Sequence, residues 1–160
     1  MLGTAREVTM RPKVYSVAIE LTAFCNQKCD YCYNEWREDG GQKVSTGDRK
    51  TLVARVSRLV SALDIDHVTL TGGEPFAHPG VFDVLDVLAE HRLRAYFISN
   101  GGIVTDAIAK RLAPYAPLGV QITLNGPDAA LHEAHVGHID GLRSQPGFQP
   151  ADRHLNRRML

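Results

Sequence analysis

The sequence has no excess of charge of either sign and no long apolar run. Its 160 residues contain 18 Lys and Arg against 18 Asp and Glu, so it lacks the basic character typical of nucleic-acid-binding proteins. No apolar run approaches the roughly 20 residues of a membrane-spanning helix. The N-terminal segment 1–13 has no apolar stretch followed by a cleavage site, as a signal peptide would. We therefore expect a cytoplasmic protein that binds neither nucleic acid nor membrane.

Cysteine is also scarce, and its placement is informative. The chain has three cysteines, Cys25, Cys29 and Cys32, all within eight residues. An odd, clustered set argues against a disulfide framework. Thiolates at this spacing can reach one compact soft-metal centre, whereas structural zinc normally takes four ligands and a cubane iron–sulfur cluster takes one thiolate per iron. Three thiolates leave one coordination position open, which indicates a centre that performs chemistry.

The remaining composition is that of an ordinary globular domain, with 44% apolar and 22% charged residues. Apolar periodicity and turn residues predict alternating strands and helices. In chain order we expect a strand at 14–22, a helix capped by Ser45 or Thr46 and ending at Asp64, a strand at 67–71, a helix at 79–91, a strand at 94–99, a helix at 105–112, a strand at 119–124 and a short helix at 128–135. This order predicts an α/β fold with parallel strands and right-handed crossovers, either an open doubly wound sheet or part of a (β/α) barrel.

Three segments organise the chain. Residues 1–13 form a polar lead-in, and residues 14–135 form the α/β core. Residues 136–160 are expected to be a loop followed by a short basic helix from Ala151, because 136–150 has no apolar period and carries three glycines and two prolines.

Polar residues follow each expected strand. The cysteines follow the first strand, Gly72–Glu74 the second, Ser99 and Asn100 the third, and Thr123 closes the fourth. Ligands of parallel α/β folds bind at the carboxyl ends of the strands. We therefore expect these residues to share one site.

Each of these residues also has an ordinary explanation. The glycines of Gly72–Glu74 would ease a turn with the carboxylate in solvent, Asn100 would be a turn residue, Tyr31 would pack on a strand, and Thr123 would be a common strand residue. Alternatively, the glycines let backbone approach a ligand, the carboxylate accepts from an ammonium group, and Asn100 binds hydroxyls or a carboxylate. Tyr31 would then shelter the metal centre, and Thr123 would face a barrel lumen.

Three histidines, His132, His135 and His138, recur every third residue and would form a metal-binding face on a continuous helix. Gly137 interrupts such a helix, so exposed loop histidines are the favoured interpretation.

Two motifs together resemble a known family. Cys25-x3-Cys29-x2-Cys32, with Tyr31 before the last cysteine, and Gly72-Gly73-Glu74-Pro75 after the second strand resemble the radical S-adenosylmethionine (radical SAM) superfamily over about residues 14–127. Within it, the segments Ile98-Ser99-Asn100-Gly101 and Leu124-Asn125-Gly126-Pro127 are most similar to the peptide-modifying, SPASM-type branch. The resemblance implies a partial TIM-type barrel, of which about four βα units are present.

The resemblance also implies the cofactors. Cys25, Cys29 and Cys32 would hold a 4Fe–4S cluster whose fourth iron chelates S-adenosylmethionine. An electron from the cluster would cleave the cofactor to methionine and a 5′-deoxyadenosyl radical, which abstracts hydrogen from a substrate, with a peptide as one candidate. A flavodoxin or ferredoxin would supply the electron.

The cofactor contacts follow from the same resemblance. Gly72, Gly73 and Glu74 would bind the methionine amino group, and Tyr31 would lie near the adenine. Ser99, Asn100 and Thr123 are candidates around the ribose and the carboxylate.

The chain also departs from the family pattern. At His135-Val136-Gly137 it lacks the arginine–glycine pair expected after the fourth strand, it has four expected strands rather than six, and it has no cysteine after Cys32 for an auxiliary cluster. These departures keep three alternatives open. The chain is a truncated or degenerate cluster-binding copy without turnover, a partner chain completes its barrel, or it is a small zinc module of three cysteines and one histidine.

Overall fold

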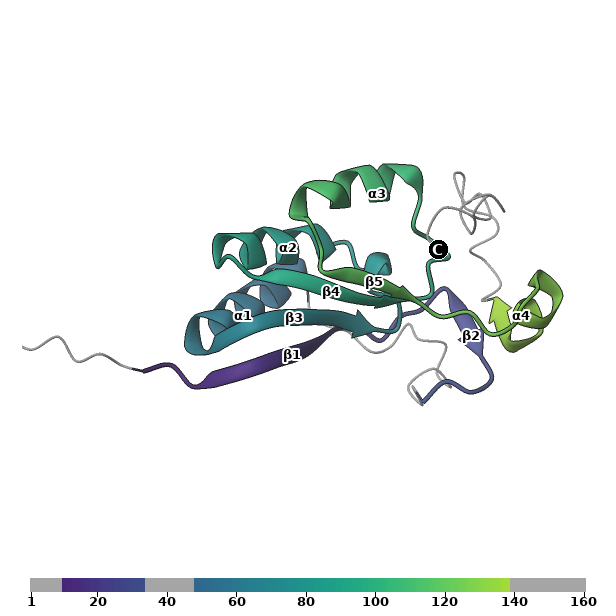
Figure 1. Cartoon of the computed structure of the whole chain (residues 1–160), viewed down its shortest axis with the longest axis horizontal. Helices are drawn as coiled ribbons and strands as arrows, with labels where there is room; N and C mark the ends of the chain where they lie inside the picture. Colours follow the sequence, from purple (N-terminus) through teal and green to yellow (C-terminus); the bar gives the residue numbers. More distant parts are fainter. Residues whose placement is uncertain (1–9, 34–47, 139–160) are drawn as a thin grey trace, which may run out of the picture.

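A four-stranded parallel sheet forms the centre of the molecule. The computed structural model describes residues 10–33 and 48–138. In these residues the sheet has the order β1-β3-β4-β5, in which each strand pairs with the next of the four along the chain. Its strands are β1 (Lys13–Thr22), β3 (Asp64–Gly72), β4 (Arg94–Ser99) and β5 (Gly119–Ile122). All four run toward the end of the molecule that carries β2 (Gln27–Cys29) and α4 (Ala129–His135) (Figure 1). The predicted parallel α/β fold is confirmed.

Helices α1 (Arg49–Ala62), α2 (Val81–Glu90) and α3 (Asp106–Leu112) contribute to one apolar core against this sheet. The apolar stripe of α1 buries Leu52, Val56 and Val60, as expected for an amphipathic helix beside a sheet. In the same core, the ring of Phe97 on β4 stacks on the ring of Phe76, with the two ring centroids 4.7 Å apart. The core therefore extends to within a few residues of the carboxyl ends of the strands, where it supports the turns described below.

The helix starts are set by local capping. Thr105 caps α3 by accepting from the Ile108 N–H at 3.3 Å, and Asp128 caps α4 by accepting from the Leu131 N–H at 2.8 Å, both at the predicted positions. The first helix begins later than predicted, because Asp48 is its cap. The alternative caps at 45 and 46 lie outside the described residues.

Other boundaries also differ from the prediction. The fourth strand, β5, ends at Ile122 rather than at residue 124, so Thr123 follows the strand instead of belonging to it. The first helix ends at Ala62, and β3 begins at Asp64 rather than at His67, because Asp64 and Ile65 already pair with β1. The second helix begins at Val81 rather than at Pro79, because the chain first makes the short 3-10 turn η2 (Pro75–Ala77).

Two short strands were not predicted at all. Val136–His138 forms β6, which pairs antiparallel with β2, so the expectation of loop from residue 136 was wrong for these residues. Strand β2 lies inside the segment that carries the three cysteines, residues 23–32, which we call the cysteine segment. Strands of three residues are too short to show a period in the sequence. The basic helix expected from residue 151 lies outside the described residues.

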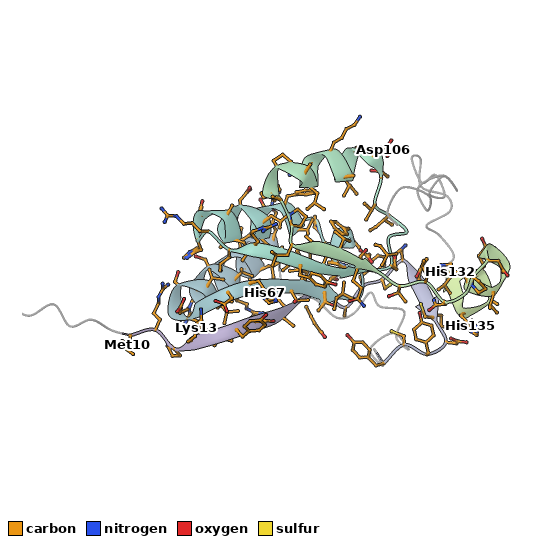
Figure 2. All side chains as sticks on the ribbon, in the orientation of Figure 1. Met10, Lys13, His67, Asp106, His132 and His135 are labelled. Carbon is orange, nitrogen blue, oxygen red and sulfur yellow. The ribbon has the colours of Figure 1, made fainter. Side chains whose placement is uncertain are left out.

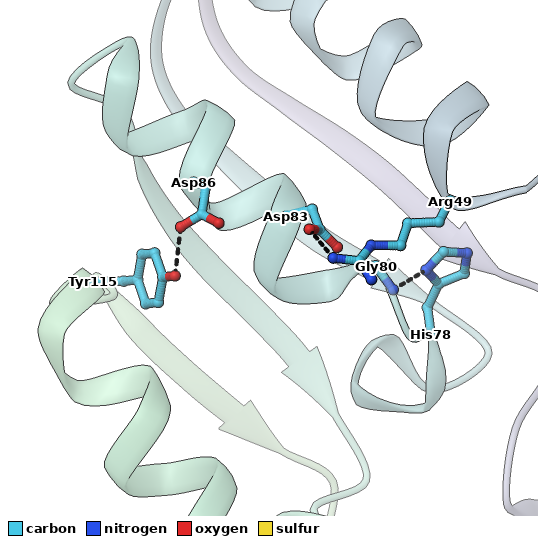
Figure 3. Close-up of polar contacts among 6 residues, drawn as sticks. All are labelled: Arg49, His78, Gly80, Asp83, Asp86 and Tyr115. Carbon is cyan, nitrogen blue, oxygen red and sulfur yellow. Dashed lines mark hydrogen bonds and ion pairs between the residues drawn. The ribbon is translucent and has the colours of Figure 1, made fainter.

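Polar contacts hold the helices to one another (Figure 3). Arg49 on α1 forms an ion pair with Asp83 on α2, and the Tyr115 hydroxyl of η3 (Ala113–Tyr115) donates to Asp86 at 2.6 Å. In the turn before α2, the Gly80 N–H donates to Nδ1 of His78 at 3.0 Å. Burial lowers the pKa of His78, which keeps the ring neutral and able to accept this hydrogen bond.

None of the helices within residues 10–33 and 48–138 is both long and apolar enough to cross a membrane.

Candidate metal and cofactor site

The residues predicted to share a site lie at one end of the sheet. The cysteine segment follows β1, the Gly72–Glu74 turn ends β3, Ser99 and Asn100 end β4, and Thr123 follows β5. The Thr123 N–H donates to the Ser99 carbonyl at 3.2 Å. Asn100 Nδ2 lies 3.4 Å from Cys25 Sγ. The strand ends therefore bring the segments together as the parallel fold requires.

Gly72 and Gly73 pack against the backbone that leads into the cysteines. The Gly73 N–H donates to the Thr22 carbonyl at 2.6 Å, and the Glu74 N–H donates to the Phe24 carbonyl at 2.8 Å. Gly72 has a φ of +123°, and a Cβ there would overlap the Thr22 oxygen. A Cβ on Gly73 would overlap the Phe24 oxygen. The close approach that requires glycine here is to the chain's own backbone.

Glu74 is fully buried, which excludes the interpretation that it sits in solvent. Its Oε1 accepts from Ser99 Oγ at 2.9 Å and from the Phe76 N–H at 3.2 Å, while Oε2 accepts from the Asn100 N–H at 2.8 Å. These three donors are all neutral. Burial raises the pKa of Glu74, and the hydrogen bonds oppose that rise. A carboxylate has about four acceptor positions, so Glu74 retains capacity for one further donor.

Ser99 and Asn100 hold the turn that follows β4. Ser99 Oγ also accepts from the Gly101 N–H at 2.9 Å, and Asn100 Oδ1 accepts from the Gly102 N–H at 2.8 Å. Asn100 Nδ2 donates to Oδ1 of Asn26 at 2.8 Å. Asn26 is buried beside Cys25 and was missed by sequence reasoning, where its position next to a cysteine was the one available signal.

The three cysteines lie on one short segment and form no disulfide among the described residues. Cys25 is buried and Cys29 and Cys32 are half-buried. The Gln27 N–H donates to Cys25 Sγ at 3.4 Å. Within residues 10–33 and 48–138, no three His, Cys, Asp or Glu side chains converge as they would around a single metal ion. A cubane cluster instead binds each thiolate to a different iron, and hydrogen bonds to its sulfurs tune it. Three thiolates fall one short of the four ligands that structural zinc normally takes, so the donor count fits such a cluster better than a mononuclear zinc ion.

The opposite side of the cysteine segment contacts α4 and its flanking residues. The Tyr31 hydroxyl donates to Asn125 Oδ1 at 2.7 Å, and the Asn125 N–H donates to His132 Nδ1 at 3.2 Å. Asp30 lies 3.0 Å from His135 Nδ1, an interaction that lowers the pKa of Asp30. Nδ2 of Asn125 is buried without a partner. Tyr31 is more than half exposed, so it does not pack on a strand.

Two of the three evenly spaced histidines therefore have other partners. His132 and His135 lie together at the α4 end of the molecule, far from Met10 and Lys13 (Figure 2). Their described contacts are to Asn125 and Asp30, and in the part of the chain that the structure describes no histidine belongs to a metal-holding group.

Comparison with known proteins gives a consistent result. The model of the radical SAM superfamily matches residues 19–140. Mycofactocin maturase MftC of Mycobacterium tuberculosis is 30% identical over 118 residues, which are 74% of this chain and 29% of that protein. A probable GTP 3',8-cyclase of Methanocella arvoryzae is 28% identical over 116 residues, which are 72% of this chain and 36% of that protein. The chain thus spans about a third of the length of these relatives.

Solved structures show the same fold. Streptococcus suis SuiB bound to S-adenosylmethionine superposes with a TM-score of 0.63 at 17% identity, over 80% of this chain and 28% of that one. The sheet and its helices correspond to part of a TIM-type barrel, as predicted. Because the family model covers more than half of the sequence and both predicted motifs lie within the matched residues, this chain belongs to the radical SAM superfamily.

Proposed function

We propose that this chain is the cofactor-binding core of a radical SAM enzyme, with a 4Fe–4S cluster held by Cys25, Cys29 and Cys32. The observation that carries the proposal is the packing of the Gly72–Glu74 turn on the backbone that leads directly into Cys25, through the hydrogen bonds from Gly73 to Thr22 and from Glu74 to Phe24. This packing puts a three-thiol segment and a fully buried carboxylate at the same strand ends. When bound, the cluster and S-adenosylmethionine supply one-electron cleavage of a carbon–sulfur bond and a radical that abstracts hydrogen from a substrate.

Glu74 binds the amino group of S-adenosylmethionine in this proposal. An ionised carboxylate surrounded by neutral donors carries a charge that burial disfavours, as the raised pKa of Glu74 indicates. An ammonium group at the remaining acceptor position would offset that cost and favour the ionised form. Gly72 and Gly73 place the carboxylate, since their backbone contacts leave no room for a side chain.

The remaining cofactor contacts come from the edges of the same site. Tyr31, exposed and hydrogen-bonded to Asn125, lies near the adenine. Ser99 and Thr123 are the residues that we propose for the ribose and carboxylate side, where the turns after β4 and β5 are joined by the Thr123–Ser99 hydrogen bond.

A peptide is the substrate class that we propose. The support comes from relatives: a mycofactocin maturase is 30% identical over the matched segment, and SuiB, which shares the fold, has been solved bound to the precursor peptide SuiA. The enzyme would work in the reducing cytoplasm with a flavodoxin or ferredoxin as electron donor. In the described sheet β1 and β5 each have one neighbour, so a partner chain that adds strands at β5 would extend the barrel.

The test is anaerobic reconstitution of the full chain with iron and sulfide. The expected result is a brown, oxygen-sensitive protein with about four irons per chain that converts S-adenosylmethionine to methionine and 5′-deoxyadenosine after reduction. The control is the chain with Cys25, Cys29 and Cys32 all changed to Ser, which should bind no cluster. A folded wild-type protein that takes up zinc, or no metal at all, would contradict the proposal.

A further inference from the structure

The side chain of Asn100 uses both of its N–H donors within the protein. One N–H of Nδ2 donates to Asn26 Oδ1 at 2.8 Å, and the other lies toward Cys25 Sγ, with Nδ2 and Sγ 3.4 Å apart. A side-chain amide has two N–H groups and one carbonyl oxygen. No donor is therefore left for a ribose hydroxyl.

The orientation of this amide is fixed by the backbone. The Gly102 N–H donates to Asn100 Oδ1 at 2.8 Å. If the amide nitrogen and oxygen of Asn100 were exchanged, its NH2 group would face the Gly102 N–H, and two donors would point at each other. The amide nitrogen must therefore face the sulfur of Cys25. Space around the amide is also limited, because a Cβ on Gly102 would lie 2.9 Å from Asn26 Nδ2 and 3.1 Å from Asn100 Oδ1.

A hydrogen bond to a ligating sulfur changes the redox properties of an iron–sulfur cluster. The N–H draws negative charge from the thiolate, which favours the reduced and more negative state of the cluster. Two such N–H donors to Cys25 are described, the side chain of Asn100 and the backbone of Gln27. Of these two, the Asn100 donor can be altered by changing a side chain.

We propose that Asn100 is a positioning residue for the cluster ligand Cys25, and that its side-chain amide raises the reduction potential of the cluster. This assignment rests on the proposed cluster and replaces ribose binding as the role of the Asn100 side chain. Asn26 holds the amide in place by accepting its second N–H.

The experiment is a redox titration of the reconstituted full chain followed by EPR of the reduced cluster. Asn100→Asp keeps the shape and the acceptor for Gly102 but removes the N–H to sulfur. At a fixed potential the ratio of reduced to oxidised cluster should fall about tenfold, which corresponds to about 59 mV for a one-electron couple. The dissociation constant of S-adenosylmethionine should change less than about twofold, since a lost hydrogen bond to the cofactor would cost about tenfold.

Asn26→Asp is the matched control, because it places a carboxylate in the same network and keeps the acceptor for Asn100. A larger fall in the reduced fraction for Asn100→Asp than for Asn26→Asp supports the proposal. Equal falls in the two variants, or an unchanged potential with weakened S-adenosylmethionine binding, overturn it.

If the Asn100→Asp variant does not retain a cluster, Gly102→Ala tests the proposal instead. The added methyl group displaces the Asn100 and Asn26 amides without changing their charge. We expect a fall in the reduced fraction that is smaller than the fall of about tenfold predicted for Asn100→Asp, and an unchanged potential overturns the proposal. A wild-type chain that forms no cluster would contradict the proposed function itself, which separates the two failures.

Discussion

The cysteine segment is held on two sides by contacts of different kinds. We call the turn residues 72–76 and 99–102 the inner anchor and residues 125–138 the outer anchor. The inner anchor uses backbone hydrogen bonds of 2.6 and 2.8 Å to Thr22 and Phe24 and a fully buried carboxylate. The outer anchor uses the three-residue β2–β6 pairing and polar pairs that include the exposed Tyr31.

This difference indicates which anchor determines the position of the cysteine segment. Buried backbone hydrogen bonds without room for a methyl group allow little displacement, whereas exposed polar pairs contribute little and exchange readily with water. The inner anchor therefore sets where Cys25 lies. The outer anchor, with the exposed Tyr31 at its contact with Asn125, is the side that can adjust.

The largest expected effect comes from adding a methyl group to the inner anchor. In Gly73→Ala the new Cβ would overlap the Phe24 carbonyl oxygen and lie 2.7 Å from that of Ala23. Because backbone cannot yield as a side chain can, we expect a loss of about 3 kcal/mol or more in the free energy of unfolding. Urea unfolding of the cluster-free chain measures this loss.

Gly80→Ala is the matched control. Its Cβ would meet side-chain atoms of His78 and Arg49 at 3.1 and 3.2 Å, so a cost of about 1 kcal/mol is expected. Equal losses in the two variants would refute the assignment of Gly73 to a rigid anchor.

The next effect concerns the charge of the inner anchor. Glu74→Gln keeps the size of the side chain but removes the negative charge that would bind an ammonium group. A hydrogen bond to a charged group contributes about 1.5–3 kcal/mol, so we expect S-adenosylmethionine to bind about 10–100-fold more weakly in equilibrium dialysis, with the iron content unchanged. Unchanged affinity would show that the carboxylate has a purely structural role.

A smaller effect is expected at the one described residue of the outer anchor that is a fully buried apolar side chain, Val136. Val136→Ala removes two carbon groups from beside Cys29, the residue it pairs with. The expected loss in unfolding free energy is about 2 kcal/mol, from lost burial and a small cavity. A loss as large as that of Gly73→Ala would mean that the two anchors are equally rigid.

The smallest effect is expected from Tyr31→Phe. This change removes the hydroxyl that donates to Asn125 while keeping the ring. An exposed hydrogen bond contributes about 1 kcal/mol or less to stability, so the thermal midpoint should stay within a few degrees by differential scanning calorimetry. A large drop would show that the outer anchor is stiffer than its exposure indicates.

The inner anchor could largely be located from the sequence, and the outer anchor could not. Glu74 and Asn100 follow long, periodic strands, and parallel strands bring their ends together wherever the helices lie. Their partners Asn26 and Phe76 remained invisible, because the sequence does not show which backbone and side-chain donors a buried carboxylate or amide will find. β6 was missed because its three residues are defined by a partner more than a hundred positions away.

That separation has a consequence for how the site assembles. In the main sheet each strand pairs with the next of the four along the chain, as Lys13 with Asp64, His67 with Arg94 and Tyr96 with Gly119, so these pairings close shorter loops than the β2–β6 pairing does. The β2–β6 pairing instead joins residue 27 to residue 138 and requires closure of a long loop, whose entropic cost grows with loop length. We therefore expect the cysteine segment to dock on β3 and β4 first during synthesis, and its second side to close only after β6 has emerged. Iron delivered before that moment would meet a half-enclosed segment.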